Sequence, residues 1–265
     1  MSTFFEKIND LDILLHCDGY EREYFFAECS RLAYKGQKLA SKEFKKVGFT
    51  SYKFCSVEGA QCHIVKNRDY IVIAFRGTEP RQFSDIKADL MAWKRKSRTE
   101  GHVHAGFKNE LDKLWADIKM GLSRKGDRKI YLCGHSLGGA IATVCASRLE
   151  KDVEELYTYG SPRVGGEIFR DNLLVDHCRV VNNNDMVAKV PFWLMGYRHH
   201  GYLTYINHYG NIRELTSWQK LKDQIRGRWC ALRKFQMFDG IRDHDINKYC
   251  KKLKSLVKIE PTFGD

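Results

Sequence analysis

The sequence predicts an α/β fold in which a central, mostly parallel sheet is covered by helices, with residues 1–265 forming a single domain. Three observations support this. Continuous apolar runs at 69–75 and 129–134 are typical of strands buried on both faces. Apolar residues between them, at 107–123, recur at helical spacing. The 265 residues are 43% hydrophobic, which is enough for one large core.

The first half of the chain is predicted to contain a helix, three strands and a second helix. In chain order they lie at residues 22–35, 51–57, 61–66, 69–75 and 107–123. The helices are assigned from apolar positions three and four residues apart, and the strands from short apolar runs. The third strand has no polar residue in its interior, so we expect it at the centre of the sheet.

Strands and helices alternate through the second half. We expect a strand, a helix, a strand, a helix and a strand, then a hairpin and two helices, at residues 129–134, 137–149, 156–162, 167–174, 178–185, 202–215, 217–235 and 244–257. Parallel strands need crossover connections, and these are usually helices. The alternation therefore favours a mixed or largely parallel sheet.

The composition indicates a folded protein of a reducing compartment. No run of 18 apolar residues is present, so we expect no membrane span. Acidic residues near the N-terminus argue against a signal peptide, and we expect a cytoplasmic location with peripheral contact with membranes. The nine scattered cysteines are interpreted as free thiols, with a disulfide framework as the alternative. No cysteine spacing suggests a metal site, and we expect no cofactor.

The net charge of +12 is unevenly spread, with twelve Lys and Arg against four Asp between residues 217 and 258. Such a surface attracts nucleic acid, anionic membranes or acidic substrates, and charge alone does not choose among them. No nucleic-acid-binding motif supports the first of these, so we expect no nucleic-acid partner. The oligomeric state is left open.

The stretch YLCGHSLGGAIATVCAS places Ser136 between Gly134 and Gly138. An apolar strand precedes this serine and a helix of small residues follows it. This is the context in which G-x-S-x-G projects a nucleophilic serine from a strained turn. The backbone N–H of Leu137, at the start of the helix, points to where an oxyanion would form. The alternative is a glycine-rich turn with an incidental serine.

A nucleophilic serine needs an imidazole base and an acid that orients it. Asp185 follows the strand body at 178–184, whereas the competing Asp176 lies before that strand. Among the histidines after Ser136, chain order disfavours His177 and favours His244, which lies after the last strand. The remaining candidates are interpreted as structural: His199, His200 and His208.

Several separated motifs make the chain resemble the class 3, fungal-type lipases, which are α/β hydrolases. The resemblance extends from about residue 22 to 255 and rests on AFRGT (74–78), VHAGF (103–107), GHSLGGA (134–140), YGSPRVG (159–165), VVNNNDMVAKVP (180–191), YRHHG (197–201) and DHDINKY (243–249). The order of the motifs also matches, which makes the resemblance more specific than the serine motif alone.

The resemblance implies a catalytic triad of Ser136, Asp185 and His244, with Thr78 and Leu137 forming the oxyanion hole. One departure is Met186, where the family usually has proline. The implied activity is hydrolysis of carboxylic esters of lipids through an acyl-enzyme. The alternatives are a phospholipase and a non-catalytic scaffold in membrane signalling.

Two further segments are predicted to contact lipid. The resemblance implies a helical lid over residues 80–98, with an ordinary surface helix as the alternative. Residues 217–235 place tryptophans and aliphatic residues at helical spacing among lysines and arginines. Basic amphipathic helices of this kind often lie at a membrane interface, although a packed core helix with a basic outer face has the same pattern.

Overall fold

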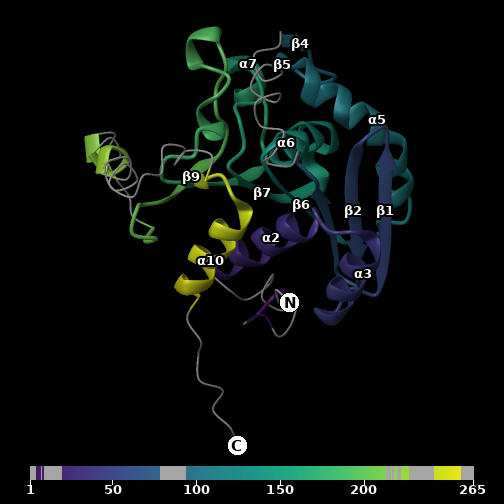
Figure 1. Cartoon of the computed structure of the whole chain (residues 1–265). Helices are drawn as coiled ribbons and strands as arrows, with labels where there is room; N and C mark the ends of the chain where they lie inside the picture. Colours follow the sequence, from purple (N-terminus) through teal and green to yellow (C-terminus); the bar gives the residue numbers. More distant parts are fainter. Residues whose placement is uncertain are drawn as a thin grey trace, which may run out of the picture.

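The structure is a computed structural model of the chain (Figure 1), and it describes residues 4–6, 8, 20–77, 94–212, 216, 218–219, 222–226 and 242–257. Its centre is a seven-stranded sheet in the order β1-β2-β3-β6-β7-β8-β9. These strands are β1 (Ser51–Val57), β2 (Ala60–Lys66), β3 (Tyr70–Phe75), β6 (Lys129–His135), β7 (Val153–Tyr159), β8 (Asp176–Asn182) and β9 (Tyr202–Ile206). The pairs β1–β2 and β2–β3 are antiparallel and the other four pairs are parallel, which confirms the predicted fold class.

Helices cover both faces of this sheet (Figure 1). Helices α2 (Tyr20–Leu32) and α10 (Ile246–Leu256) share one apolar cluster with the sheet, and α5 (Ala105–Leu122) and α6 (Leu137–Leu149) share the other. Alternate residues of β3 enter opposite clusters, Val72 the first and Ile73 the second. This burial on both faces explains the uninterrupted apolar run of the strand.

Shorter elements complete the described fold. They are α3 (Gln37–Lys46), α7 (Glu167–Asp171), the two-stranded sheet of β4 (Lys94–Lys96) and β5 (His102–His104), and the 3₁₀ turns η2 (Glu150–Asp152), η3 (Val187–Lys189) and η4 (Trp193–Met195). Helix α3 was not expected, because only Ala40 and Phe44 supply its buried apolar contacts among many lysines.

The hairpin predicted at 202–215 is described only in part. Strand β9 pairs in parallel with β8. After it, Ile206 forms a single antiparallel bridge with Ile212, the last residue described before the gap at 213–215. Asn207 forms the turn between these two residues, because its side-chain oxygen accepts hydrogen bonds from the backbone N–H groups of Tyr209 and Asn211. An asparagine that bonds its own following backbone forms a turn rather than a strand.

Three other elements differ from the prediction or are only partly described. The helix expected at 167–174 ends at Asp171. Residues 94–96 of the predicted lid form strand β4 rather than helix, and residues 80–93 lie outside the described residues. In the predicted basic helix, residues 222–226 are helical, whereas 227–235 lie outside the described residues.

All seven cysteines within the described residues are buried free thiols. Within the same residues, no helix is long and apolar enough to span a bilayer. The cytoplasmic location stays a prediction.

One buried carboxyl group lies between α2 and the sheet. Glu23 is 7% exposed, and one of its carboxylate oxygens has no hydrogen-bond partner among the described residues. The other accepts a weak hydrogen bond from the Cys178 thiol at 3.7 Å. Burial raises the pKa of Glu23 from about 4.5 to about 7, because the charged form loses its hydration.

This carboxyl group should make the stability of the protein depend on pH. Since the pKa of Glu23 is higher in the folded state, its contribution is most favourable below about pH 4.5 and is lost as the pH rises through 7. We expect Glu23→Gln to be more stable than the parent at pH 8, with the difference shrinking towards pH 5. Urea denaturation at both pH values measures this. The partly exposed Glu21→Gln is the control, and an equal effect in both variants would contradict the prediction.

Candidate active site

Ser136 stands on a strained turn between β6 and α6. Its backbone has φ 60° and ψ −131°, a conformation that residues with a side chain rarely adopt. Its N–H donates to the carbonyl of Tyr159 on β7 at 2.9 Å. The Oγ is buried and has no hydrogen-bond partner among the described residues. The serine motif therefore forms the strand-turn-helix arrangement that was predicted for it.

The glycines of this turn are required by close backbone contacts. A Cβ on Gly134 would lie 2.7 Å from the nitrogen of Gly139, and a Cβ on Gly138 would lie 2.9 Å from that of Gly77. Real Cβ atoms do not approach backbone atoms so closely, so only glycine permits these segments to meet.

Asp185 and His244, 59 residues apart, lie in direct contact. His244 Nδ1 is 3.0 and 2.9 Å from the two carboxylate oxygens of Asp185, and both residues are buried. A carboxylate accepts, so Nδ1–H donates and the neutral imidazole keeps its basic lone pair on Nε2. The structure thus brings together the acid and the base that the sequence predicted.

The carboxylate of Asp185 receives two more hydrogen bonds. Tyr249 Oη donates to Oδ2 at 2.5 Å, and the N–H of Val187 donates to Oδ1 at 2.8 Å. Burial, followed by the charge of Asp185, raises the pKa of Tyr249 well above its ordinary value, so the phenol keeps its proton. Three donors on a buried carboxylate offset the cost of its lost hydration.

The imidazole of His244 is connected to the serine turn through His135, the residue that precedes Ser136. The two imidazole rings lie 4.4 Å apart, and His135 Nε2 is 2.6 Å from the backbone carbonyl of His244. A carbonyl only accepts, so Nε2 carries the proton and Nδ1 accepts from the hydroxyl of Tyr34 at 2.8 Å. Burial, together with the nearby His244, holds the pKa of His135 well below its ordinary value, so this ring stays neutral.

Gly160, at the end of β7, lies where these groups converge. Its φ is +55°, and a Cβ there would collide with Asp185 Oδ2 and lie 2.9 Å from His244 Nδ1. The strand that carries this glycine lies between β6, which leads to Ser136, and β8, which leads to Asp185. The carboxyl ends of these parallel strands therefore bring the predicted residues to one edge of the sheet.

The oxyanion hole is only partly described. Leu137 is the first residue of α6, where a backbone N–H has no acceptor within its own helix. Thr78 lies outside the described residues. Its neighbour Gly77 passes close to the serine, since a Cβ on Gly77 would lie 3.2 Å from that of Ser136.

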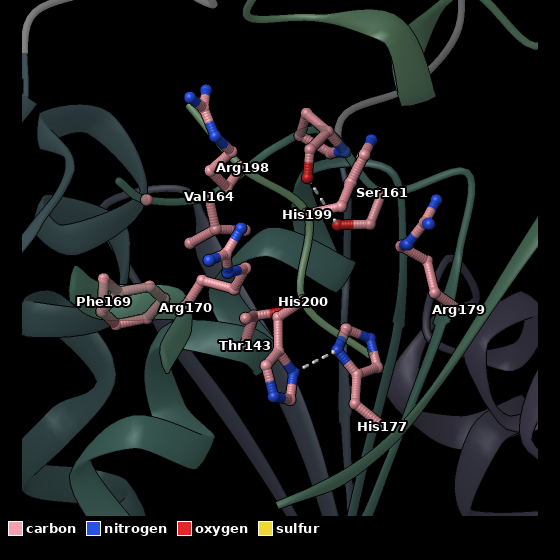
Figure 2. A pocket seen from close by; sticks show the side chains of 12 residues that line it. Thr143, Ser161, Val164, Phe169, Arg170, His177, Arg179, Arg198, His199 and His200 are labelled. Carbon is pink, nitrogen blue, oxygen red and sulfur yellow. Dashed lines mark hydrogen bonds between the residues drawn. The ribbon is translucent and has the colours of Figure 1, made fainter. Parts of the chain in front are cut away.

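The competing residues lie elsewhere. Asp176 is exposed at the opposite end of β8. Figure 2 shows His177, His199 and His200 at a separate cavity of about 10 Å³. His177 contacts His200 at 3.1 Å and the hydroxyl of Thr158 at 2.8 Å.

The other histidines of this group also have structural contacts. His199 Nε2 donates to the carbonyl of Ala188 at 2.8 Å. His208 uses its backbone N–H to donate to Asp223 Oδ2 at 3.0 Å. Burial lowers the pKa values of His177, His199 and His200, so these rings are neutral structural groups.

Sequence reasoning missed several residues that hold the site. Tyr249, Tyr34 and Gly160 were not singled out, and neither was Asn182, whose side chain donates to the carbonyl of Asp243 at 2.8 Å. Tyr249 is one turn beyond His244, but a lone tyrosine on a helix is far more often a core residue. Only the folded chain shows that its hydroxyl reaches Asp185.

We expect Tyr249→Phe to lower the free energy of unfolding by about 1–3 kcal/mol, because a buried carboxylate loses one of its donors. Chemical denaturation measures the change. Tyr20→Phe, at the exposed start of α2, is the control and should change little. Equal changes in both variants would show that the hydroxyl of Tyr249 has no special role.

Comparisons with known proteins agree with this geometry. The family model described as "Lipase (class 3)" matches residues 72–195. A secreted mono- and diacylglycerol lipase of Fusarium solani is 41% identical over 106 residues, covering 37% of this chain and 32% of its own. A lipase of Rhizomucor miehei is 31% identical over 147 residues, covering 49% of this chain and 40% of its own. The alignments thus span less than half the length of these relatives.

The fold is also that of solved lipases. The crystal structure of a lipase from Rhizopus microsporus var. chinensis superimposes with a TM-score of 0.58 and 25% sequence identity, covering 70% of this chain and 74% of the other. The mixed, mostly parallel sheet of this chain thus matches the fold of a solved fungal lipase. The matched motifs, the sheet and the serine turn together make this chain similar to the class 3, fungal-type lipases, which are α/β hydrolases.

Proposed function

We propose that this chain is a serine hydrolase that cleaves carboxylic esters of lipids, as an acylglycerol lipase or esterase, with Ser136, His244 and Asp185 as its catalytic triad. The observation that carries the proposal is the buried hydrogen bond between His244 and Asp185, held against the turn that presents Ser136. An orienting carboxylate, a neutral imidazole and a serine on a strained turn are the parts that acyl transfer needs.

In the proposed mechanism, Ser136 Oγ attacks the ester carbonyl while His244 Nε2 takes the hydroxyl proton. His244 then gives this proton to the leaving alcohol as the tetrahedral intermediate collapses to an acyl-enzyme. Asp185 stays ionised and stabilises the imidazolium that forms transiently. Water, deprotonated by the same imidazole, attacks the acyl group and releases the acid together with the regenerated serine.

The oxyanion of each tetrahedral intermediate is proposed to accept hydrogen bonds from the backbone N–H groups of Leu137 and Thr78. The support for Leu137 is its position in the first turn of α6, where the helix dipole also favours negative charge. For Thr78 the support is the neighbouring Gly77, which lies beside Ser136.

The lipid nature of the substrate is supported by the relatives. The Fusarium solani relative is named as a mono- and diacylglycerol lipase. We therefore propose an acylglycerol as the substrate class, without a choice of chain length. Hydrolysis of phospholipids at a higher rate than acylglycerols in a panel of purified lipids would overturn this choice.

Ser136→Ala should abolish hydrolysis of short p-nitrophenyl esters, because it removes the hydroxyl on which the acyl-enzyme is proposed to form. Removal of the triad serine typically leaves about one part in 10⁶ of turnover. Labelling by a fluorophosphonate probe, followed by mass spectrometry, should locate the adduct on Ser136 and should not occur in the variant.

The control for this experiment is Ser147→Ala, on the same helix α6 but with its hydroxyl bonded to the carbonyl of Val144 at 2.8 Å. It should keep the activity and the labelling. If the parent chain is neither labelled nor active although folded, the hydrolase proposal is wrong and a non-catalytic scaffold explains the chain better.

Peripheral contact with an anionic lipid surface is also part of the proposal. Its support is the net charge of +12 and the described part of the basic segment 217–235. There, Asp223 is buried and accepts from the hydroxyl of Tyr205 at 3.0 Å, which anchors one side of the segment. The other side exposes Trp218 and Ile225 beside Lys222 and Arg226.

Replacing both Lys222 and Arg226 by glutamine should weaken sedimentation with vesicles that contain phosphatidylglycerol. The reason is that each lost cation removes about 1 kcal/mol of attraction to an anionic surface. Binding to neutral phosphatidylcholine vesicles should not change. An equal loss on both kinds of vesicle would rule out the electrostatic explanation.

A further inference from the structure

Residues 192–195, which we name the apolar loop, expose four consecutive large apolar side chains. Phe192 is 50% exposed, Trp193 60%, Leu194 78% and Met195 37%. Single apolar residues are common on protein surfaces, but a contiguous group of this size usually marks a binding surface. Figure 1 shows the loop projecting from the body of the molecule, at the end where the β4–β5 sheet lies.

The backbone of the apolar loop is held in place by hydrogen bonds. The N–H of Met195 donates to the carbonyl of Phe192 at 3.0 Å, which closes the turn η4. Arg163 Nη1 donates to the carbonyl of Pro191 at 2.9 Å, and Arg198 Nη1 donates to that of Trp193 at 3.0 Å. The turn is therefore fixed by polar contacts of its backbone, while its side chains point outwards.

Cations surround the base of the loop. Arg198 touches it directly, and Lys94 Nζ lies 5.0 Å from the ring centroid of Tyr197 and beside Gly196. Arg95 and Lys96, on the same strand as Lys94, are exposed. The apolar side chains at the tip suit the apolar interior of a bilayer, and the cations behind them suit its anionic headgroups.

The chain connects the apolar loop closely to the candidate site. The loop lies seven residues beyond Asp185, and η3 (Val187–Lys189) forms half of that interval. Met186, beside the acid, is also exposed, so apolar surface recurs between the two. A lipid surface that received the loop would thus lie at the edge of the sheet where the triad residues converge.

We propose that the apolar loop inserts into the interfacial region of an anionic lipid bilayer and holds the active-site edge of the protein against it. This inference deepens and rests on the proposed function, since it names the surface through which the enzyme reaches its substrate. Tryptophan and phenylalanine side chains favour the headgroup level of a bilayer. Leu194, at the tip of the loop, would reach the boundary of the apolar interior.

The test uses the Ser136→Ala chain, so that no lipid is consumed, and vesicles of phosphatidylglycerol and phosphatidylcholine in equal parts. Sedimentation gives the partition coefficient. Adding Trp193→Ser and Leu194→Ser should lower it at least about tenfold, because two apolar side chains no longer leave water. Leu174→Ser is the matched control: this leucine is 84% exposed but lies between α7 and β8, near the amino end of β8. It should leave the coefficient within about twofold.

Two further measurements distinguish a loss of membrane binding from unfolding and from dimerisation. The thermal midpoint shows that each variant is folded. Size-exclusion chromatography shows whether the loop joins two copies of the chain instead. An unchanged partition coefficient in the loop variant, an equal loss in Leu174→Ser, or a dimer in the parent that the loop variant dissociates would each overturn the inference.

Hydrolysis of a soluble short ester by the unmodified chain tests the proposed function separately. If that hydrolysis is absent while vesicle binding still depends on the loop, the docking surface stands and the catalytic proposal fails. If hydrolysis is present and the loop variant binds vesicles as well as its parent, the reverse holds.

Discussion

The site depends on one constraint: three backbone segments approach so closely around Ser136 that the residues at their contact points cannot carry a Cβ. These segments are the turn between β6 and α6, residues 75–77 at and just after the end of β3, and Gly160 after β7. A Cβ added at their glycines would collide with another of these segments or with a triad residue. This approach is possible only because glycines stand at the contact points. The strained backbone of Ser136 is held by the packing of β6 and α6 on either side of it.

A buried polar network is built on this scaffold. Asp185 is a desolvated carboxylate, and its charge is tolerated because His244, Tyr249 and the N–H of Val187 all donate to it. His135 and Tyr34 hold the other side of the His244 loop through its backbone carbonyl. The same hydrogen bonds therefore stabilise the fold and orient the imidazole, so stability and the proposed catalysis share residues.

On the outer surface, polar contacts hold the backbone in place rather than orient a buried side chain. The described part of the basic segment is anchored through the buried Asp223, and the apolar loop through Arg163 and Arg198. In both, polar contacts hold the backbone and leave aromatic or aliphatic side chains in solvent beside cations. An enzyme whose substrate is insoluble needs such surfaces, because its reaction begins only after the protein has reached the lipid.

Much of this protein was determined by its sequence alone. The apolar run of β3, the α6 helix and the turn at Ser136 depend on local patterns, so periodicity and glycine spacing were enough to predict them. Strand position favoured Asp185, chain order favoured His244, and the resemblance to the class 3 lipases implied the same two residues. Contacts between distant residues were decided only by the tertiary structure. The hydroxyl of Tyr249 reaches Asp185 across 64 positions, and β9 joins the sheet through parallel pairing with β8. A local pattern records which face of an element is apolar, whereas a hydrogen bond between remote segments depends on how all the layers pack together.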